Sequence, residues 1–294
     1  MIPPLHMRNW RCLGIIRFCS VILSLLILSC TSNSDNQEGE AQPDDQQNQK
    51  AKQVEQHSSE PQGAEQVDAD PVSDVPANGR EQYPILGSGN AVDFLRNYFE
   101  EHPERIISLS TRYGNLSIQL YEDTPLHTAN FLMMIKRGYF SGTEFTRVVE
   151  NFVVQGGNSE REEDEIKRML IGNYLIPSEI RDRHIHRKGA LAMARSYTDN
   201  PKKLSSAYDF YFVVGQVFNE PQLLALEREH EMSIPTWKRE VYTSVGGAPH
   251  LDGQHTVFGQ VIKGMDVLEK MSKTPVDEGN WPLERLIMQL EVVE

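Results

Sequence analysis

The sequence predicts a β-dominated domain with a few helices, which occupies residues 105–294 of the chain. Three observations support this prediction. Aromatic and apolar residues become frequent only from about Asn90 onward. Short runs in which apolar and polar residues alternate recur in this part, which is typical of half-buried strands. No internal repeat is found, so a repeat architecture is not indicated. Periodicity alone does not decide whether the strands close into a barrel.

The first predicted element is a helix. Its apolar residues are spaced for one helical face and the run stops before Pro103. Residues 85–104 are therefore predicted to be an N-terminal helical extension. A second helix begins where Thr124 precedes Pro125 and ends at Gly138. Strands, the first two forming a hairpin, are predicted over residues 105–111, 116–121, 145–149 and 152–155.

The second half of the domain continues this mixture. Asn219-Glu220-Pro221 opens a helix that runs through Glu231, and Pro235 starts another helix. A further helix is predicted over residues 265–271. Strands are predicted over residues 190–194, 210–215, 257–262 and 286–293.

The first thirty residues have the layout of a bacterial secretion signal. Arginines precede an apolar run over residues 18–28. This run is shorter than a membrane-spanning helix, which needs about twenty residues. Ile27-Leu28-Ser29-Cys30 resembles the lipobox of bacterial lipoproteins, in which the cysteine is lipidated after cleavage. Residues 1–29 are therefore expected to be a lipoprotein signal peptide and Cys30 the lipidation site. A transmembrane anchor and an ordinary signal peptide stay open as alternatives.

Residues 30–84 are expected to be the lipidated cysteine and a disordered acidic tether. Residues 31–80 contain no Phe, Trp or Tyr and carry eleven acids against three basic residues. Such a segment cannot bury enough apolar surface to offset its conformational entropy. The tether would hold the domain in the bacterial cell envelope, in the periplasm or at the cell surface, with the lipid in a membrane. Because no basic stripe follows downstream, nucleic-acid binding is not expected.

The domain contains no cysteine, since all three lie within the first thirty residues. A disulfide, a thiolate metal site and a thiol nucleophile are therefore excluded there. His184-Ile185-His186 would place two imidazoles on one face of a strand, but no third ligand follows nearby. No metal and no cofactor are expected, and the protein is expected to be a monomer.

Four stretches carry a more specific pattern, and they cover residues 114–145, 145–157, 188–195 with 210–215, and 249–271. In this order they resemble the cyclophilin family of peptidyl-prolyl cis-trans isomerases. The resemblance implies an eight-stranded antiparallel barrel capped by two helices, with a proline-binding groove on its outer face. Residues 158–187 and 216–246 exceed a minimal family member. The second segment is an extra helical insertion, for which partner binding and plain structural elaboration both stay open.

Rotation about an X-Pro bond faces a barrier of about 20 kcal/mol and needs no nucleophile or metal. A catalyst has to hold the proline ring and stabilise the twisted amide. The resemblance implies that Arg147 is the catalytic arginine and that Gln155 hydrogen-bonds the substrate backbone. A permanently charged guanidinium aimed at the prolyl nitrogen favours the twisted state. The implied substrate-binding positions are Phe152, Val153, Ala194, Arg195, Asp209, Tyr211, His250, Leu251 and His255.

The same residues also have simpler interpretations. Arg147 alone is an ordinary strand arginine, and the apolar positions alone are core residues. Six positions depart from the family: His250 replaces a frequent tryptophan, Thr146 a frequent histidine, Val153 a common methionine, Tyr211 a common phenylalanine, Tyr208 a serine and Asp209 a glutamine. Asp209 is expected at the groove rim within reach of Arg147, so its replacement by glutamine is expected to raise activity.

Two alternative functions follow from this resemblance. The first is a peptidyl-prolyl isomerase that acts on proline-containing polypeptides while envelope proteins fold. The second is a catalytically weak cyclophilin-like module that binds proline peptides as a chaperone or scaffold. The match at Arg147, Phe152 and Gln155 favours the enzyme, whereas Tyr208 and Asp209 favour the binding module.

Overall fold

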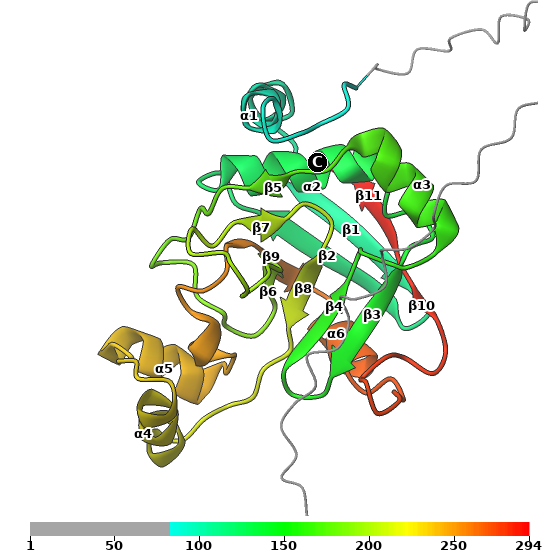
Figure 1. Cartoon of the computed structure of the whole chain (residues 1–294). Helices are drawn as coiled ribbons and strands as arrows, with labels where there is room; N and C mark the ends of the chain where they lie inside the picture. The colour runs from blue at the N-terminus through cyan, green and yellow to red at the C-terminus, as the bar shows by residue number, and fades with distance from the viewer. Residues whose placement is uncertain (1–82, 294) are drawn as a thin grey trace, which may run out of the picture. The chain divides into compact units, whose positions relative to one another are not determined.

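The computed structural model describes residues 83–293 (Figure 1). The expected signal peptide, lipidation at Cys30 and all but the end of the tether lie outside the described residues. Within residues 83–293, no helix has the length and apolar character needed to cross a membrane. In chain order the elements are α1 (Ala91–Glu101), β1 (Ile106–Thr111), β2 (Gly114–Leu120), α2 (Pro125–Lys136), β3 (Glu144–Val149), β4 (Val153–Gly156), α3 (Glu162–Ile171), β5 (Leu175–Ile176), β6 (Ala190–Met193), β7 (Ser205–Ser206), β8 (Phe210–Val213), α4 (Glu220–Glu229), α5 (Thr236–Ser244), the 3₁₀ turn η1 (Pro249–Leu251), β9 (Val257–Lys263), α6 (Met265–Met271), β10 (Leu286–Ile287) and β11 (Gln289–Val292).

The predicted β-dominated antiparallel architecture is confirmed, and the strands form a nearly closed barrel. The sheet order is β10-β3-β4-β8-β6-β9-β2-β1-β11. β10 pairs with β3 and β11 pairs with β1, so the two halves of the last run join both edges of the sheet. The sheet therefore has nine strands rather than the expected eight, because the final run is interrupted at Met288. Closure leaves few unpaired strand edges.

Four elements were not predicted: α3, the turn η1, and the short strands β5 and β7, which pair with each other. The apolar residues of α3 did not predict a helix with one buried face, because most of them are exposed to solvent. Ile166, Met169 and Leu170 are exposed, and only Asp164 and Ile171 are buried in this helix. A helix whose apolar side does not face the core escapes a prediction based on amphipathic spacing.

Side chains alternate between the two faces of the wall formed by β4, β8 and β6. One set points into the barrel and joins the main core: Val154, Leu191, Met193, Phe210 and Phe212. The other set points outward and forms a smaller apolar cluster: Val153, Ala190, Ala192, Tyr211 and Val213, with Ala248, Leu251 and Val257 added from the following segments. This outer cluster is the floor of the candidate site. α2 lies across one end of the barrel (Figure 1).

The N-terminus of α2 is capped from a distant part of the chain. The side chain of Thr124, the expected cap, makes no capping hydrogen bond. Instead the Glu179 carboxylate accepts from the backbone N–H of Leu126 at 3.1 Å and of His127 at 3.0 Å. A carboxylate stabilises the positive end of a helix dipole. The His127 ring lies between Glu179, at 2.7 Å, and Ser205, at 2.9 Å.

The predicted helices of the insertion are α4 and α5, which lie beside each other at one side of the barrel (Figure 1). Asn219 and Gln222 form a capping box at the start of α4. Arg239 of α5 forms ion pairs with Glu220 at 2.7 Å and Glu227 at 2.5 Å. The helices share a small apolar core, whose buried members are Ile185, Phe218, Leu223, Ile234 and Tyr242.

Candidate active site

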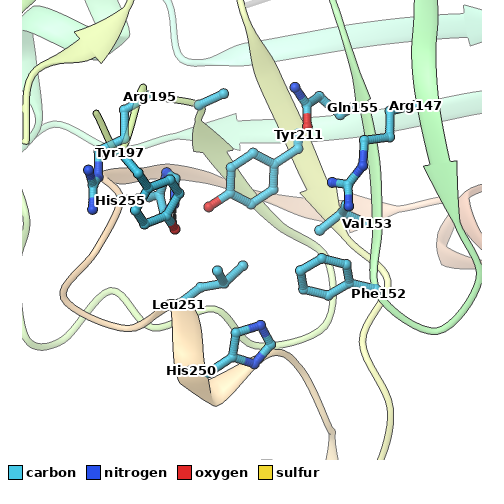
Figure 2. A pocket seen from close by; sticks show the side chains of 11 residues that line it. Arg147, Phe152, Val153, Gln155, Arg195, Tyr197, Tyr211, His250, Leu251 and His255 are labelled. Carbon is cyan, nitrogen blue, oxygen red and sulfur yellow. Dashed lines mark hydrogen bonds between the residues drawn. The ribbon is translucent and has the colours of Figure 1, made fainter. Parts of the chain in front are cut away.

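A groove of about 360 Å³ opens on the outer face of the barrel. Figure 2 shows Arg147 and Gln155 at one end, His255 and Tyr197 at the other, and the Tyr211 ring between them. Every residue predicted for this site except Asp209 lines the groove, and Tyr197 joins them. The lining residues are Arg147, Phe152, Val153, Gln155, Ala194, Arg195, Tyr197, Tyr211, His250, Leu251 and His255. They include two arginines and no carboxylate, which suits a ligand rich in carbonyl oxygens.

A bulge in β3 directs Arg147 to the groove. Strict alternation would put Phe145 and Arg147 on the same face, and Phe145 is buried in the barrel core. The pairing of β3 with β4 shifts its register between these two residues, so Arg147 turns to the outer face. Its guanidinium carbon lies 5.8 Å from the centre of the Phe152 ring. Among the described residues the guanidinium has no hydrogen bond or ion pair, so its donors are available to a ligand.

The apolar wall of the groove is a stack of rings. Phe152 and His250 stack at 5.3 Å with 26° between their planes, and His250 stacks on His230 at 5.1 Å. His230 follows the last turn of α4, so the insertion supports this wall. Burial lowers the pKa of His250, and the positive charge that nearby His230 can carry acts in the same direction. A neutral imidazole is therefore favoured at the position of the family's tryptophan.

Ala194 and Arg195, predicted to contact a peptide, both line the groove but differ in how their backbone groups are used. The Ala194 N–H donates to the Asp209 carbonyl, and the Ala194 carbonyl accepts from the Ser206 N–H, both at 2.9 Å. Both backbone groups of Ala194 are therefore already engaged within the barrel, although the residue lines the groove. The backbone groups of Arg195 have no partner among the described residues, while its guanidinium is held by Gln254.

Asp209 lies behind the groove lining and holds Gln155. Its carboxylate accepts from the Gln155 amide at 3.4 Å and from the Asn158 amide at 3.1 Å. No ion pair between Asp209 and Arg147 is found among the described residues, so the expected pair is a wrong prediction. Burial raises the pKa of Asp209, against the lowering effect of these two hydrogen bonds. Tyr208 also points away from the groove, and its hydroxyl donates to the Gly172 carbonyl.

This geometry reverses the effect expected for Asp209. Asp209→Ala should lower kcat/KM for a proline peptide about three- to fivefold, because the Gln155 amide loses its acceptor and becomes less well oriented. Steady-state kinetics on the purified protein would measure the change. Asn158→Ala is the matched control, since it removes the other partner of the same carboxylate and should leave activity unchanged. A rise in activity for Asp209→Ala would instead support a neutralising contact with Arg147.

His255 closes the far end of the groove as a neutral ring. Its Nδ1 lies 3.2 Å from the Met193 carbonyl and its Nε2 lies 2.7 Å from the Tyr197 hydroxyl. Because a carbonyl only accepts, Nδ1 carries the proton and Nε2 accepts from Tyr197. Burial, reinforced by His186, lowers the pKa of His255 to about 4. Tyr197 had no family motif to mark it and was missed by the sequence prediction.

The lowered pKa of His255 predicts a loss of stability in mild acid. The unfolded chain binds this proton below about pH 6.5, and the folded chain binds it only below about pH 4. Between these values the unfolded state holds more protons, so stability falls as the pH falls, by about 3 kcal/mol across the window. Urea unfolding from pH 7.5 to 4 should show a shallower loss for His255→Gln than for the wild-type protein. Equal pH slopes for the two proteins would contradict this assignment.

Comparison with known proteins identifies one family and several relatives. The family described as cyclophilin type peptidyl-prolyl cis-trans isomerase/CLD matches residues 106–292. A Staphylococcus saprophyticus relative, also named for this activity, is 31% identical over 200 residues, which cover 63% of this chain and 90% of the relative. A peptidyl-prolyl cis-trans isomerase of Acinetobacter baylyi is 29% identical over 171 residues, which cover 58% of this chain and 73% of the relative. A Cryptosporidium parvum cyclophilin type isomerase, crystallised in the presence of the dipeptide Ala-Pro, matches with a TM-score of 0.46 and 20% identity over 65% of this chain and 99% of that one.

The structure is a nearly closed antiparallel barrel with an arginine beside an apolar groove on its outer face. The chain belongs to the cyclophilin-type peptidyl-prolyl cis-trans isomerases, since the family match covers more than half of its length. Its activity is the cis-trans isomerisation of X-Pro bonds.

Proposed function

We propose that this protein is a lipid-anchored isomerase that accelerates X-Pro rotation while polypeptides fold in the bacterial cell envelope. The observation that carries the catalytic part is the Arg147 guanidinium, which lies beside an apolar floor and has no hydrogen bond or ion pair among the described residues. The envelope part rests on the sequence from Ile27 to Cys30 and on the acidic segment that follows it.

In the proposed mechanism the proline ring packs against Phe152, Tyr211 and Leu251. The backbone of Arg195 and the amide of Gln155 bind the peptide on either side of the ring. The Arg147 guanidinium then donates toward the prolyl nitrogen, whose lone pair becomes available as the amide twists. A charged donor that is already in place favours this twisted state over both planar states. A barrier lowered by about 5–8 kcal/mol would accelerate rotation by about four to six orders of magnitude.

The alternative of a catalytically weak binding module loses its main support. It depended on Tyr208 and Asp209, which depart from the family at the groove. The Tyr208 hydroxyl is turned away from the groove, and Asp209 orients Gln155 without pairing with Arg147 among the described residues. Neither residue obstructs the floor on which a proline ring would lie.

A protease-coupled assay separates the two functions. The purified protein should accelerate the cis-to-trans conversion of a proline tetrapeptide in proportion to its concentration, and also the proline-limited refolding of an unfolded protein. Peptide binding without acceleration in either assay would support the binding module instead. Fractionation of cells that carry the full chain tests the envelope part separately.

A further inference from the structure

A chain of buried polar groups connects the floor of the groove to the insertion. The Tyr211 hydroxyl lies 3.0 Å from His186 Nε2, and the two rings are nearly parallel. His186 Nδ1 lies 3.2 Å from Asp252 Oδ1, which also accepts from the His186 backbone N–H at 2.9 Å. Two residues of α5 complete the chain: Tyr242 donates to Asp252 Oδ1 at 2.9 Å and Lys238 to Asp252 Oδ2 at 2.8 Å.

The chemistry of these groups fixes the direction of each hydrogen bond. His186 and Asp252 are buried, with side chains 1% and 6% exposed. Although burial opposes it, contact with His186 and Lys238 lowers the pKa of Asp252, so its carboxylate is ionised and only accepts. His186 Nδ1 therefore carries the ring proton and donates to Asp252. Burial lowers the pKa of His186, so its Nε2 stays a lone-pair acceptor for the Tyr211 hydroxyl.

This arrangement addresses a difficulty created by a tyrosine at the groove floor. Tyr211 is only 4% exposed, and a buried hydroxyl without a partner costs about 1–3 kcal/mol. A ring free to swing about its side-chain torsions would also carry this polar group into the groove, where the proline ring is proposed to lie. In Figure 2 the hydroxyl points away from Arg147. The bond to His186 keeps it there and leaves the ring face to the ligand.

We propose that the insertion over residues 216–246 positions the groove floor, with His186, Asp252 and Lys238 acting through the Tyr211 hydroxyl. The proposal rests on the proposed function, in which the Tyr211 ring contacts the substrate proline. It gives the insertion a role within the isomerase site rather than as a separate docking element. The nearby His184 belongs to a different contact, since its ring bonds to Asp123 and stacks on Tyr121.

A double-mutant cycle between Lys238 and Tyr211 tests this role. Lys238→Met should lower kcat/KM about fivefold in the wild-type background, because Asp252 loses the cation that fixes it. In the Tyr211→Phe background the same substitution should change kcat/KM by less than about 1.5-fold, since no hydroxyl remains to be held. Lys238→Arg, which keeps the charge, should restore most of the activity. Equal losses in both backgrounds would overturn the proposal, because they would show a structural effect that does not pass through Tyr211.

Arg239→Met is the matched control. Arg239 is the neighbouring cation on α5, with a side chain 19% exposed against 16% for Lys238, and its ion pairs stay within the insertion. Its replacement should lower the melting temperature without changing kcat/KM. If Lys238→Met does not fold, Tyr242→Phe removes another donor to Asp252 at nearly constant volume and should show the same dependence on Tyr211.

The affinity for an unreactive proline peptide, measured by titration calorimetry on the same variants, separates this proposal from the proposed function. If the protein has no turnover but its Kd still shows coupling between Lys238 and Tyr211, the isomerase function is refuted and the positioning role stands. If the protein has turnover but shows no such coupling, the isomerase function stands and the positioning role is refuted.

Discussion

Arg147→Ala is expected to lower kcat/KM for a proline peptide at least tenfold, and by about a hundredfold if the guanidinium acts as a preorganised donor to the twisted amide. The melting temperature should change little, because the Arg147 guanidinium has no hydrogen bond or ion pair within residues 83–293. Arg147→Lys should recover only part of the activity, since an ammonium lacks the planar fork of donors. Kinetics and thermal unfolding of the same preparations would measure both effects.

Arg112→Ala is the matched control for Arg147. This arginine also lies against an aromatic ring, that of Tyr113, and pairs with Glu284 away from the groove. Its loss should leave kcat/KM unchanged. If Arg147→Ala keeps wild-type activity, the assignment of the catalytic residue is wrong.

Cys30→Ala is expected to abolish membrane retention of the processed protein. The lipobox-like sequence predicts that Cys30 carries the lipid, and the segment after it is too polar to hold the protein at a membrane. In cells that express the full chain, the variant should accumulate as the unprocessed precursor or leave the membrane fraction. Mass spectrometry and fractionation would measure this change, and we expect nearly all of the processed variant to be absent from the membrane fraction.

Cys12→Ala and Cys19→Ala are controls for the lipidation experiment, since both cysteines precede the predicted cleavage site. Both variants should be processed and retained like the wild-type protein. Unchanged mass and fractionation of Cys30→Ala would contradict the lipoprotein assignment and favour a transmembrane anchor.

The parts of the fold and site that depend on short-range pattern could be predicted from the sequence. The strands that carry Val153, Gln155 and Tyr211 alternate with period two, so their two faces follow once one core residue is known. The motif around Arg147 was recognisable because its neighbours are adjacent in sequence. The bulge that turns Arg147 outward was not predicted, because strict alternation gives no sign of it.

The parts that depend on long-range contacts could not be predicted. Barrel closure requires β10 and β11 to pair with opposite edges of the sheet, which periodicity does not encode. The contact of Asp209 was wrongly predicted because its rim position fits either Arg147 or Gln155, and only the fold distinguishes them. His186 meets Asp252 across 66 residues of chain. No local pattern marks such a partner.

Catalysis of X-Pro rotation by Arg147 is tested most directly by exchange NMR on a proline peptide at equilibrium with a catalytic amount of the purified protein. We expect exchange cross-peaks between the cis and trans forms that grow with protein concentration and fall at least tenfold with Arg147→Ala. Peptide signals that shift on binding without exchange cross-peaks, or cross-peaks that persist unchanged in Arg147→Ala, would contradict this expectation.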